Sequence, residues 1–372
     1  MGFKPTDSTS YCTTGVVVVV VVPLKNMATG LTGLCNLGNT CFLNSCIQVL
    51  NHTPELTTFL DSNAYARHLK SNLPEHVVLE EWKALRVMMW QQNGVVSPNR
   101  FVHRVHELAM KKGRQLFTGW AQNDLPEFLL FLVECMHSSI SRQVAMRIHG
   151  HVEHPVDRLA MECYAMLQET YKSEYSEIMD MFYGIYVSEL SGLDGAMKSR
   201  KPESFFILDL EVHSKGPADN DVSLYRTLQE CIQSFTQVEV LEGDNAWFNE
   251  CTQQKESVNK RITFWNFPTI LVITLKRFHD GSKKLQHLVD FPLTELDLSQ
   301  YVVGYHPSRY VYDLIGICNH SGNTMGGHYT AYVLHRDSGT WTHFNDTSVE
   351  HIPTSKLVTA KAYCLFYRRK MN

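Results

Sequence analysis

A cysteine stands where a glycine-containing turn meets the start of an apolar helical pattern. Residues 33–40 form the predicted turn, Cys41 follows it, and the apolar side chains of residues 42–50 recur at helical spacing. The positive end of a helix favours an anion, so we expect a thiol here to favour its nucleophilic thiolate form. Asn36 lies on the turn, where its side-chain amide could donate to an oxyanion. Taken alone, the same pattern also fits a buried cysteine without a chemical role.

A histidine and an asparagine with complementary chemistry lie far along the chain. The glycine-rich segment 320–327 leads into His328 at the start of a predicted strand, and Asn345 follows seventeen residues later. Neighbouring antiparallel strands could place the two side chains together. A Cys–His–Asn set needs this contact, because the histidine takes the thiol proton while the amide orients the imidazole. A lone histidine among the 18 of this chain would more often be structural.

The elements that must position these residues change in type along the chain. Helical periodicity predominates from Gly33 to about Glu177, with helices predicted over 77–90, 127–136 and 155–181. Asp124 can cap the second of these helices, and Pro126 suits its first turn. After Phe182 the pattern predicts strands at 205–212, 269–275, 310–317, 329–334, 341–344 and 362–367. Helices followed by a largely antiparallel sheet indicate an α+β fold.

Length and composition are those of an ordinary folded protein. The chain has 372 residues, of which 44% are hydrophobic and 19% charged, and its formal charge is −4. This length exceeds what one hydrophobic core usually serves, and the charge gives no general attraction to nucleic acid or acidic membranes. The ten cysteines are scattered and no two stand three positions apart. We therefore expect free thiols in a reducing compartment and no C-x-x-C zinc site.

The start of the chain is unusual. Val16–Val22 is an unbroken valine run, too short to span a bilayer and followed by a poor signal-peptide cleavage site. We predict that residues 1–29 are a disordered N-terminal extension and that the folded domain covers residues 30–370.

Several segments, in order, resemble the signature motifs of the ubiquitin-specific proteases, a family of papain-like deubiquitinating cysteine proteases. Residues 33–45 resemble G-L-x-N-L-G-N-T-C-[YF]-[ML]-N-S, and residues 122–129 are similar to Q-x-D-A-x-E-F-L. Residues 275–278 match L-K-R-F, and residues 320–332 and 341–346 resemble H-S-G-x-x-x-G-G-H-Y-x-A-Y and W-x-x-F-[ND]-D. The resemblance runs from about Gly30 to Tyr367. It implies a papain-like fold with a helical thumb (about 33–177), β-stranded fingers (about 182–262) and a β-rich palm (about 263–370).

By position in these motifs, the resemblance implies roles for five residues. Cys41 would be the nucleophile, His328 the general base, and Asn345 the residue that orients His328. Asn36 would donate to the oxyanion, and Asp346 would be a second helper beside the triad.

The resemblance also implies a binding site for the tail of ubiquitin, formed by Gln122, Asp124, Glu127, Phe128, Gly327 and Tyr329. The tail reads Arg-Leu-Arg-Gly-Gly, so the carboxylates of Asp124 and Glu127 suit its arginines, and a narrow channel suits its glycines. Both carboxylates also fit the helix cap described above. Loops 279–287 and 321–327 look like the family's loops over this channel, and the glycines of the second permit movement.

The chain departs from the family at the zinc site that many members carry in the fingers. Gly192 and Gly195 stand where the first C-x-x-C pair is expected, and Asn249 and Thr252 where the second is expected, with Cys251 between them. A tetrahedral thiolate site cannot form from these residues. We therefore expect no metal and no cofactor.

The predicted function is that of a thiol deubiquitinase, which hydrolyses the isopeptide or peptide bond after the C-terminal glycine of ubiquitin. The expected partners are ubiquitin and ubiquitinated proteins, without nucleic acid or membrane, and we expect a monomer in the cytoplasm or nucleus. Three alternatives stay open: a protease for another ubiquitin-like modifier, an inactive ubiquitin-binding relative, and a papain-like endopeptidase. The papain context C-G-[SA]-C-[WY] is absent.

Overall fold

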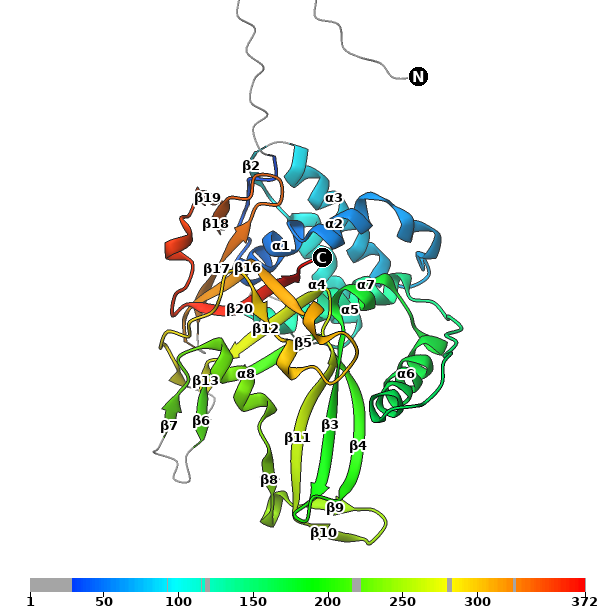
Figure 1. The fold of residues 1–372 in the computed structure, drawn as a ribbon. Coiled ribbons are helices and arrows are strands. Elements are labelled where there is room, and N and C mark those ends of the chain that lie inside the picture. The colour runs from blue at the N-terminus through cyan, green and yellow to red at the C-terminus, as the bar shows by residue number, and fades with distance from the viewer. Residues whose placement is uncertain are drawn as a thin grey trace, which may run out of the picture.

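The chain folds into a group of helices, a large sheet beside them, and a narrow sheet that extends away from both (Figure 1). A computed structural model describes residues 29–91, 93–114, 116–117, 121–215, 222–279, 283–323 and 326–371. The predicted N-terminal extension, apart from Thr29, lies outside these residues. Helices come first and strands follow, which confirms the α+β prediction.

The first half of the chain is mainly helical. Its helices are α1 (Cys41–Asn51), α2 (Pro54–Asp61), α3 (Glu75–Gln91), α4 (Asn99–Lys111), α5 (Leu125–Ile140), α6 (Pro155–Ser173) and α7 (Glu177–Phe182). Two short strands, β1 (Thr32–Leu34) and β2 (Gly94–Val96), pair in parallel beside them. The predicted cap of α5 is present, since the Asp124 side chain accepts a hydrogen bond from the backbone of Glu127.

The prediction of one helix over 155–181 is wrong in one respect, because the chain forms two helices there, α6 and α7, with a break between them. The backbone of Tyr175 exchanges two hydrogen bonds with that of Arg142, at 2.8 and 2.9 Å. A residue bonded in this way to another segment cannot also continue the helical ladder. The Arg142 side chain reinforces the junction by a bidentate salt bridge with the Glu177 carboxylate.

The large sheet has eight strands, most of them antiparallel. Its order is β19 (Ser348–His351), β18 (Trp341–Asn345), β17 (Gly327–Leu334), β16 (Val311–Gly322), β20 (Ala362–Arg369), β12 (Ile270–Lys276) and β5 (Ile207–Glu211), with β15 (Leu296–Asp297) also on β16. Five of the predicted strands correspond to β12, β16, β17, β18 and β20. The single strand predicted over 205–212 is wrong, because Phe205 ends a strand of the narrow sheet and β5 joins the large one.

The narrow sheet has four strands and a hairpin at its tip. It consists of β4 (Met197–Phe205), β3 (Gly184–Gly192), β11 (Val258–Asn266) and β8 (Glu239–Leu241), and the tip pairs β9 (Trp247–Asn249) with β10 (Gln254–Glu256). Asn249 and Thr252 donate to the Glu256 carboxylate at 2.6 and 2.9 Å. At one of the two places where the resemblance implies zinc cysteines, a hydrogen bond thus connects the two strands of the tip. The described residues contain no group of three or more His, Cys, Asp or Glu side chains placed to hold a metal.

Three further elements complete the described chain. Helix α8 (Leu228–Thr236) lies between the two sheets (Figure 1), and the hairpins are β6 (His213–Lys215) with β7 (Val222–Leu224) and β13 (Phe278–His279) with β14 (Lys283–Lys284). None of the helices described is long and apolar enough to cross a lipid bilayer.

Close packing of α1 on the large sheet brings the N-terminal and C-terminal parts of the chain together. All residues of α1 are buried, and the helix lies against β16, β17 and β18. Gly316 makes the approach possible, because a Cβ atom at this position would lie 2.4 Å from Cγ1 of Val49 on the helix. The absence of a side chain on β16 therefore sets the distance between the helix that starts at Cys41 and the strand that starts near His328.

We predict that Gly316→Ala lowers the free energy of unfolding by about 1–3 kcal/mol, because the added methyl group overlaps Val49. Val49→Ala should restore part of this loss in the double variant by opening space for the methyl group. Urea unfolding of both single variants and the double variant measures the coupling. Additive losses would show that the two positions are not in contact.

Candidate active site

His328 and Asn345 are in direct contact. Nε2 of His328 lies 2.6 Å from Oδ1 of Asn345. The register of β17 with β18 pairs Ala331 with Phe344, so the two residues are diagonal neighbours on one face of the sheet. An amide oxygen only accepts, so Nε2 carries the proton and Nδ1 keeps a lone pair for a proton taken from a thiol. The contact predicted between these strands is thus present.

Cys41 is the first residue of α1 and lies against the same strand. Its side chain is buried, and a hydrogen bond from the backbone N–H of Tyr329, the residue after His328, reaches the sulfur. Among the described residues no hydrogen bond joins this sulfur to the His328 ring. Cys41 and His328 therefore lie on elements that are in contact, α1 and β17, without a hydrogen bond between their side chains among the described residues.

The environment of Cys41 favours the thiol over the thiolate. Burial raises its pKa, the backbone N–H of Tyr329 opposes this change, and the negative charge of Asp346 raises the pKa again. The expectation that the helix end would favour the thiolate is therefore wrong for this conformation. Loss of solvent outweighs the partial positive charge of the helix end. Formation of the thiolate in this environment would require a base.

Asp346 holds the turn that carries Asn36. Its carboxylate accepts from Nδ2 of Asn36 at 3.0 Å and from Nδ2 of Asn44 at 2.8 Å, and its backbone oxygen accepts from the N–H of Leu34 at 2.8 Å. Oδ1 of Asn36 accepts from the backbone N–H of Thr40 at 3.1 Å. Both ends of the Asn36 amide are thus fixed by hydrogen bonds.

The residues predicted to bind the ubiquitin tail are distributed around this centre. The Gln122 side chain donates to the backbone oxygen of Gly327 at 2.6 Å and accepts from its N–H. Asp124 accepts from the Tyr363 hydroxyl at 2.6 Å, and burial raises the pKa of its carboxyl group. Glu127 is exposed on the same helix start, and Tyr329 is buried.

Phe128 is the exception among these residues. Its side chain has no exposed surface and packs edge-on against Phe42, with the ring centroids 5.3 Å apart. The predicted substrate contact is therefore wrong for this side chain. Phe128 packs α5 against α1 in the hydrophobic core and supports the site from within the protein.

Two contributors were not identified from the sequence. Asn44 lies one turn into α1, and its place in the first motif is the signal that could have shown it. Tyr363 comes from β20, and nothing in its local sequence indicates that its hydroxyl meets Asp124. Only the pairing of distant strands brings these groups together.

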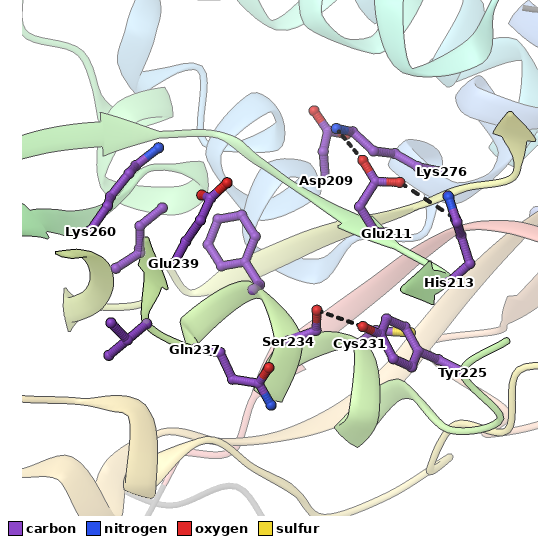
Figure 2. Close-up of a pocket in the computed structure, with 13 residues that line it drawn as sticks. Asp209, Glu211, His213, Tyr225, Cys231, Ser234, Gln237, Glu239, Lys260 and Lys276 are labelled. Atoms are coloured by element: carbon purple, nitrogen blue, oxygen red, sulfur yellow. Dashed lines mark hydrogen bonds and ion pairs between the residues drawn. The ribbon is translucent and has the colours of Figure 1, made fainter. Parts of the chain in front are cut away.

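A cavity of about 570 Å³ lies next to this region, between α8, the narrow sheet and the large sheet. Figure 2 shows Asp209 and Glu211 from β5, Lys276 from β12, and Glu239 and Lys260 from the narrow sheet. Glu211 pairs with Lys276 at 3.1 Å. Asp209 lies close enough to raise the pKa of Asp124. Acidic side chains therefore lie both at the start of α5 and in the cavity, where Lys260 and Lys276 also line the wall.

Comparison with known proteins identifies the family. The family model described as "Ubiquitin carboxyl-terminal hydrolase" matches residues 32–367, which is most of the chain. The chain therefore belongs to the ubiquitin carboxyl-terminal hydrolase family. The predicted family resemblance is confirmed.

The curated relatives include ubiquitin carboxyl-terminal hydrolase 2 of Homo sapiens, which is 36% identical over 351 residues, and ubiquitin carboxyl-terminal hydrolase 21 of Homo sapiens, 32% identical over 362 residues. The matches cover 91% and 92% of this chain but only 55% and 62% of those proteins. Ubiquitin carboxyl-terminal hydrolase 2 of Gallus gallus is 35% identical, with 93% of its length covered.

Solved structures confirm the fold. The chain is similar to one in a SAGA DUB module of Ubp8, Sgf11, Sus1 and Sgf73 bound to monoubiquitin, with a TM-score of 0.69 and 24% identity. The match covers 95% of this chain and 72% of that one. A second structure of the Ubp8 module, bound to ubiquitin aldehyde, gives a TM-score of 0.68 over 95% of this chain and 72% of that one.

We predict that alkylation of Cys41 by iodoacetamide in the unbound protein keeps accelerating above the ordinary thiol pKa of 9.0. The reagent reacts with the thiolate, and a raised pKa moves formation of the thiolate to higher pH. Mass spectrometry of the modified peptide measures the rate, with exposed Cys251 as the internal control. A plateau at Cys41 that is already complete near pH 7 would contradict a protonated resting thiol.

Proposed function

We propose that this chain is a cysteine-type deubiquitinase, with Cys41 as nucleophile, His328 as general base and Asn345 as the residue that orients the base. The observation that carries the proposal is the 2.6 Å contact between His328 and Asn345 beside the buried Cys41 thiol. Membership of the hydrolase family supports it. The bond cleaved would be the isopeptide or peptide bond after the last glycine of ubiquitin.

In the first step, Nδ1 of His328 takes the proton of the Cys41 thiol. The sulfur attacks the carbonyl carbon of the glycine, and the carbonyl oxygen becomes an oxyanion. The free N–H of Asn36 donates to this oxygen, and Asp346 holds Asn36 in place through the contact at 3.0 Å. Asp346 therefore acts through Asn36, as a helper to the oxyanion donor.

In the second step, the His328 imidazolium gives its proton to the leaving amine as the tetrahedral intermediate collapses. A thioester between Cys41 and the glycine remains. His328 then takes a proton from water, the hydroxide oxygen attacks the thioester carbon, and the released sulfur recovers the proton. Asn345 keeps the ring in one orientation throughout, through the oxygen that accepts from Nε2.

The proposal that this site binds the ubiquitin tail depends on negative charge near the site. Asp124 and Glu127 at the start of α5, with Asp209 beyond them, suit the two arginines of the Arg-Leu-Arg-Gly-Gly tail. Gln122, Gly327 and Tyr329 would flank the two glycines. The helices, the narrow sheet and the large sheet would serve as thumb, fingers and palm, with β5 in the palm because it pairs with β12.

Ubiquitin and ubiquitinated proteins are the partners we propose, acted on by a monomer in the cytoplasm or nucleus. The solved Ubp8 structures, described as bound to monoubiquitin and to ubiquitin aldehyde, support ubiquitin as the ligand. The nine described cysteines are all unpaired, which supports a reducing compartment. Neither nucleic acid nor membrane is part of the proposal.

We predict that Cys41→Ser abolishes release of fluorophore from ubiquitin with a C-terminal fluorogenic amide and keeps ubiquitin binding. Serine lacks a readily ionised thiol but preserves the shape of the site. A ubiquitin probe with a cysteine-reactive end should label the wild type at Cys41, while matched probes built on other ubiquitin-like modifiers should not. Labelling by such a modifier instead would favour the alternative protease, and no labelling by any probe would reject the nucleophile assignment.

We predict that Asn36→Ala lowers kcat about 100- to 1,000-fold with little change in KM, because the donor acts on charge that develops in the transition state. Asp346→Ala should lower kcat less, and the double variant should be no slower than Asn36→Ala, since both act through one amide. Steady-state kinetics of the four forms measures this coupling. Multiplicative losses would mean that Asp346 acts independently of Asn36.

A further inference from the structure

A lysine outside the proposed triad is held beside the strand that carries the base. Nζ of Lys284, on β14, lies 2.9 Å from Nδ1 of His320 and 2.5 Å from the backbone oxygen of the same residue on β16. The ammonium also lies 6.0 Å from the ring centroid of Phe278, its partner across the β13–β14 hairpin. One lysine thus connects the hairpin to the large sheet.

His320 in turn packs against the residues next to His328. Its side chain is 4% exposed, and its ring centroid lies 4.6 Å from that of Tyr329, the residue opposite it on β17. At Gly327 the approach is closer still, because a Cβ atom there would lie 2.2 Å from Nε2 of His320. Gln122 holds the N–H and the carbonyl of Gly327. The backbone immediately before His328 is therefore held by two side chains, Gln122 and His320.

The charges determine which nitrogen of His320 carries its proton. Burial lowers the pKa of His320 to about 4, with Lys284 and His328 contributing, so the ring is neutral at pH 7. Burial also lowers the pKa of Lys284 to about 8, which leaves most of its amine charged at pH 7. An ammonium has donors and no acceptor, so Nδ1 of His320 must accept and Nε2 must carry the hydrogen.

We propose that Lys284 is a positioning residue of the active site: it fixes His320 as the Nε2–H tautomer and ties the β13–β14 hairpin to the strands that bear Gly327 and His328. The inference rests on the proposed thiol-protease function. Without the ammonium, Nδ1 of His320 loses its donor inside a cluster of aromatic rings, and the ring no longer has one preferred orientation. Gly327 and the base that follows it then lose one of their two supports.

The kinetic test compares Lys284→Met, which keeps the chain length without a donor, with Lys284→Arg, which keeps donors. Lys284→Met should lower kcat about 10- to 100-fold with KM nearly unchanged, because displacement of the base affects the chemical step. Lys284→Arg should recover most of the loss. Exposed Lys356 supplies the matched control, and Lys356→Met should behave as wild type. Rates are divided by the fraction of sites that the reactive ubiquitin probe titrates, so that unfolded protein does not count.

A spectroscopic measurement tests the pair without relying on turnover. In wild-type protein labelled with ¹⁵N-histidine, His320 should show a protonated Nε2 and an unprotonated Nδ1, and its signals are assigned by their loss in His320→Gln. Lys284→Met should give a mixture of tautomers. A protonated Nδ1 in the wild type, or Lys284→Met with unchanged kcat, would overturn the inference. If wild-type protein fails to hydrolyse ubiquitin substrates, the proposed function fails, while the tautomer still decides whether Lys284 orients His320.

Discussion

The contact between α1 and the large sheet decides whether the proposed site can form, because its residues come from opposite ends of the chain. Cys41 and Asn36 belong to the N-terminal segment, whereas His328 and Asn345 lie on strands formed by the C-terminal segment. No local interaction can bring these groups together. A buried helix on a strand that has a glycine at the crossing point brings them together. Close packing of this kind is stiff, so small changes of volume at the crossing are transmitted to the site.

One turn carries two residues that contact different parts of the proposed site. Asn345 ends β18 and its side chain meets His328, whereas the next residue, Asp346, has a positive φ of 48° and directs its carboxylate to Asn36 and Asn44. Neighbouring residues thus contact the proposed base and the proposed oxyanion donor separately. The backbone turn between them therefore links the position of the His328 ring to that of the Asn36 side chain. This division explains why the Asp346 carboxylate can lie next to Asn345 without contacting His328.

The sequence was sufficient to predict the parts of the site that depend on local motifs. The turn before Cys41, the cap at Asp124 and the diagonal pair of His328 with Asn345 could be predicted, because each depends on short segments with known geometry. The break at Tyr175 and the division of 205–212 between two sheets could not, since both arise from backbone pairing with segments distant in the sequence. The same limit applies to Cys41, whose pKa depends on burial by the surrounding fold, and to Phe128, whose side chain proved to belong to the core.

A buried, protonated thiol has a consequence for how such a site would select its substrate. Among the contacts described for the unbound protein, no hydrogen bond joins Cys41 to His328. Burial also disfavours the thiolate form of Cys41. Reactivity then requires a change that brings the imidazole to the sulfur and supplies polar groups around the developing charge. A bound tail beside Gly327 would contribute to both effects, because it would lie against the residue that precedes His328. Binding energy from contacts far from the cleaved bond would be used to complete the site. A short peptide cannot supply those contacts, so discrimination against it would follow from the resting state of the thiol as well as from the shape of the channel.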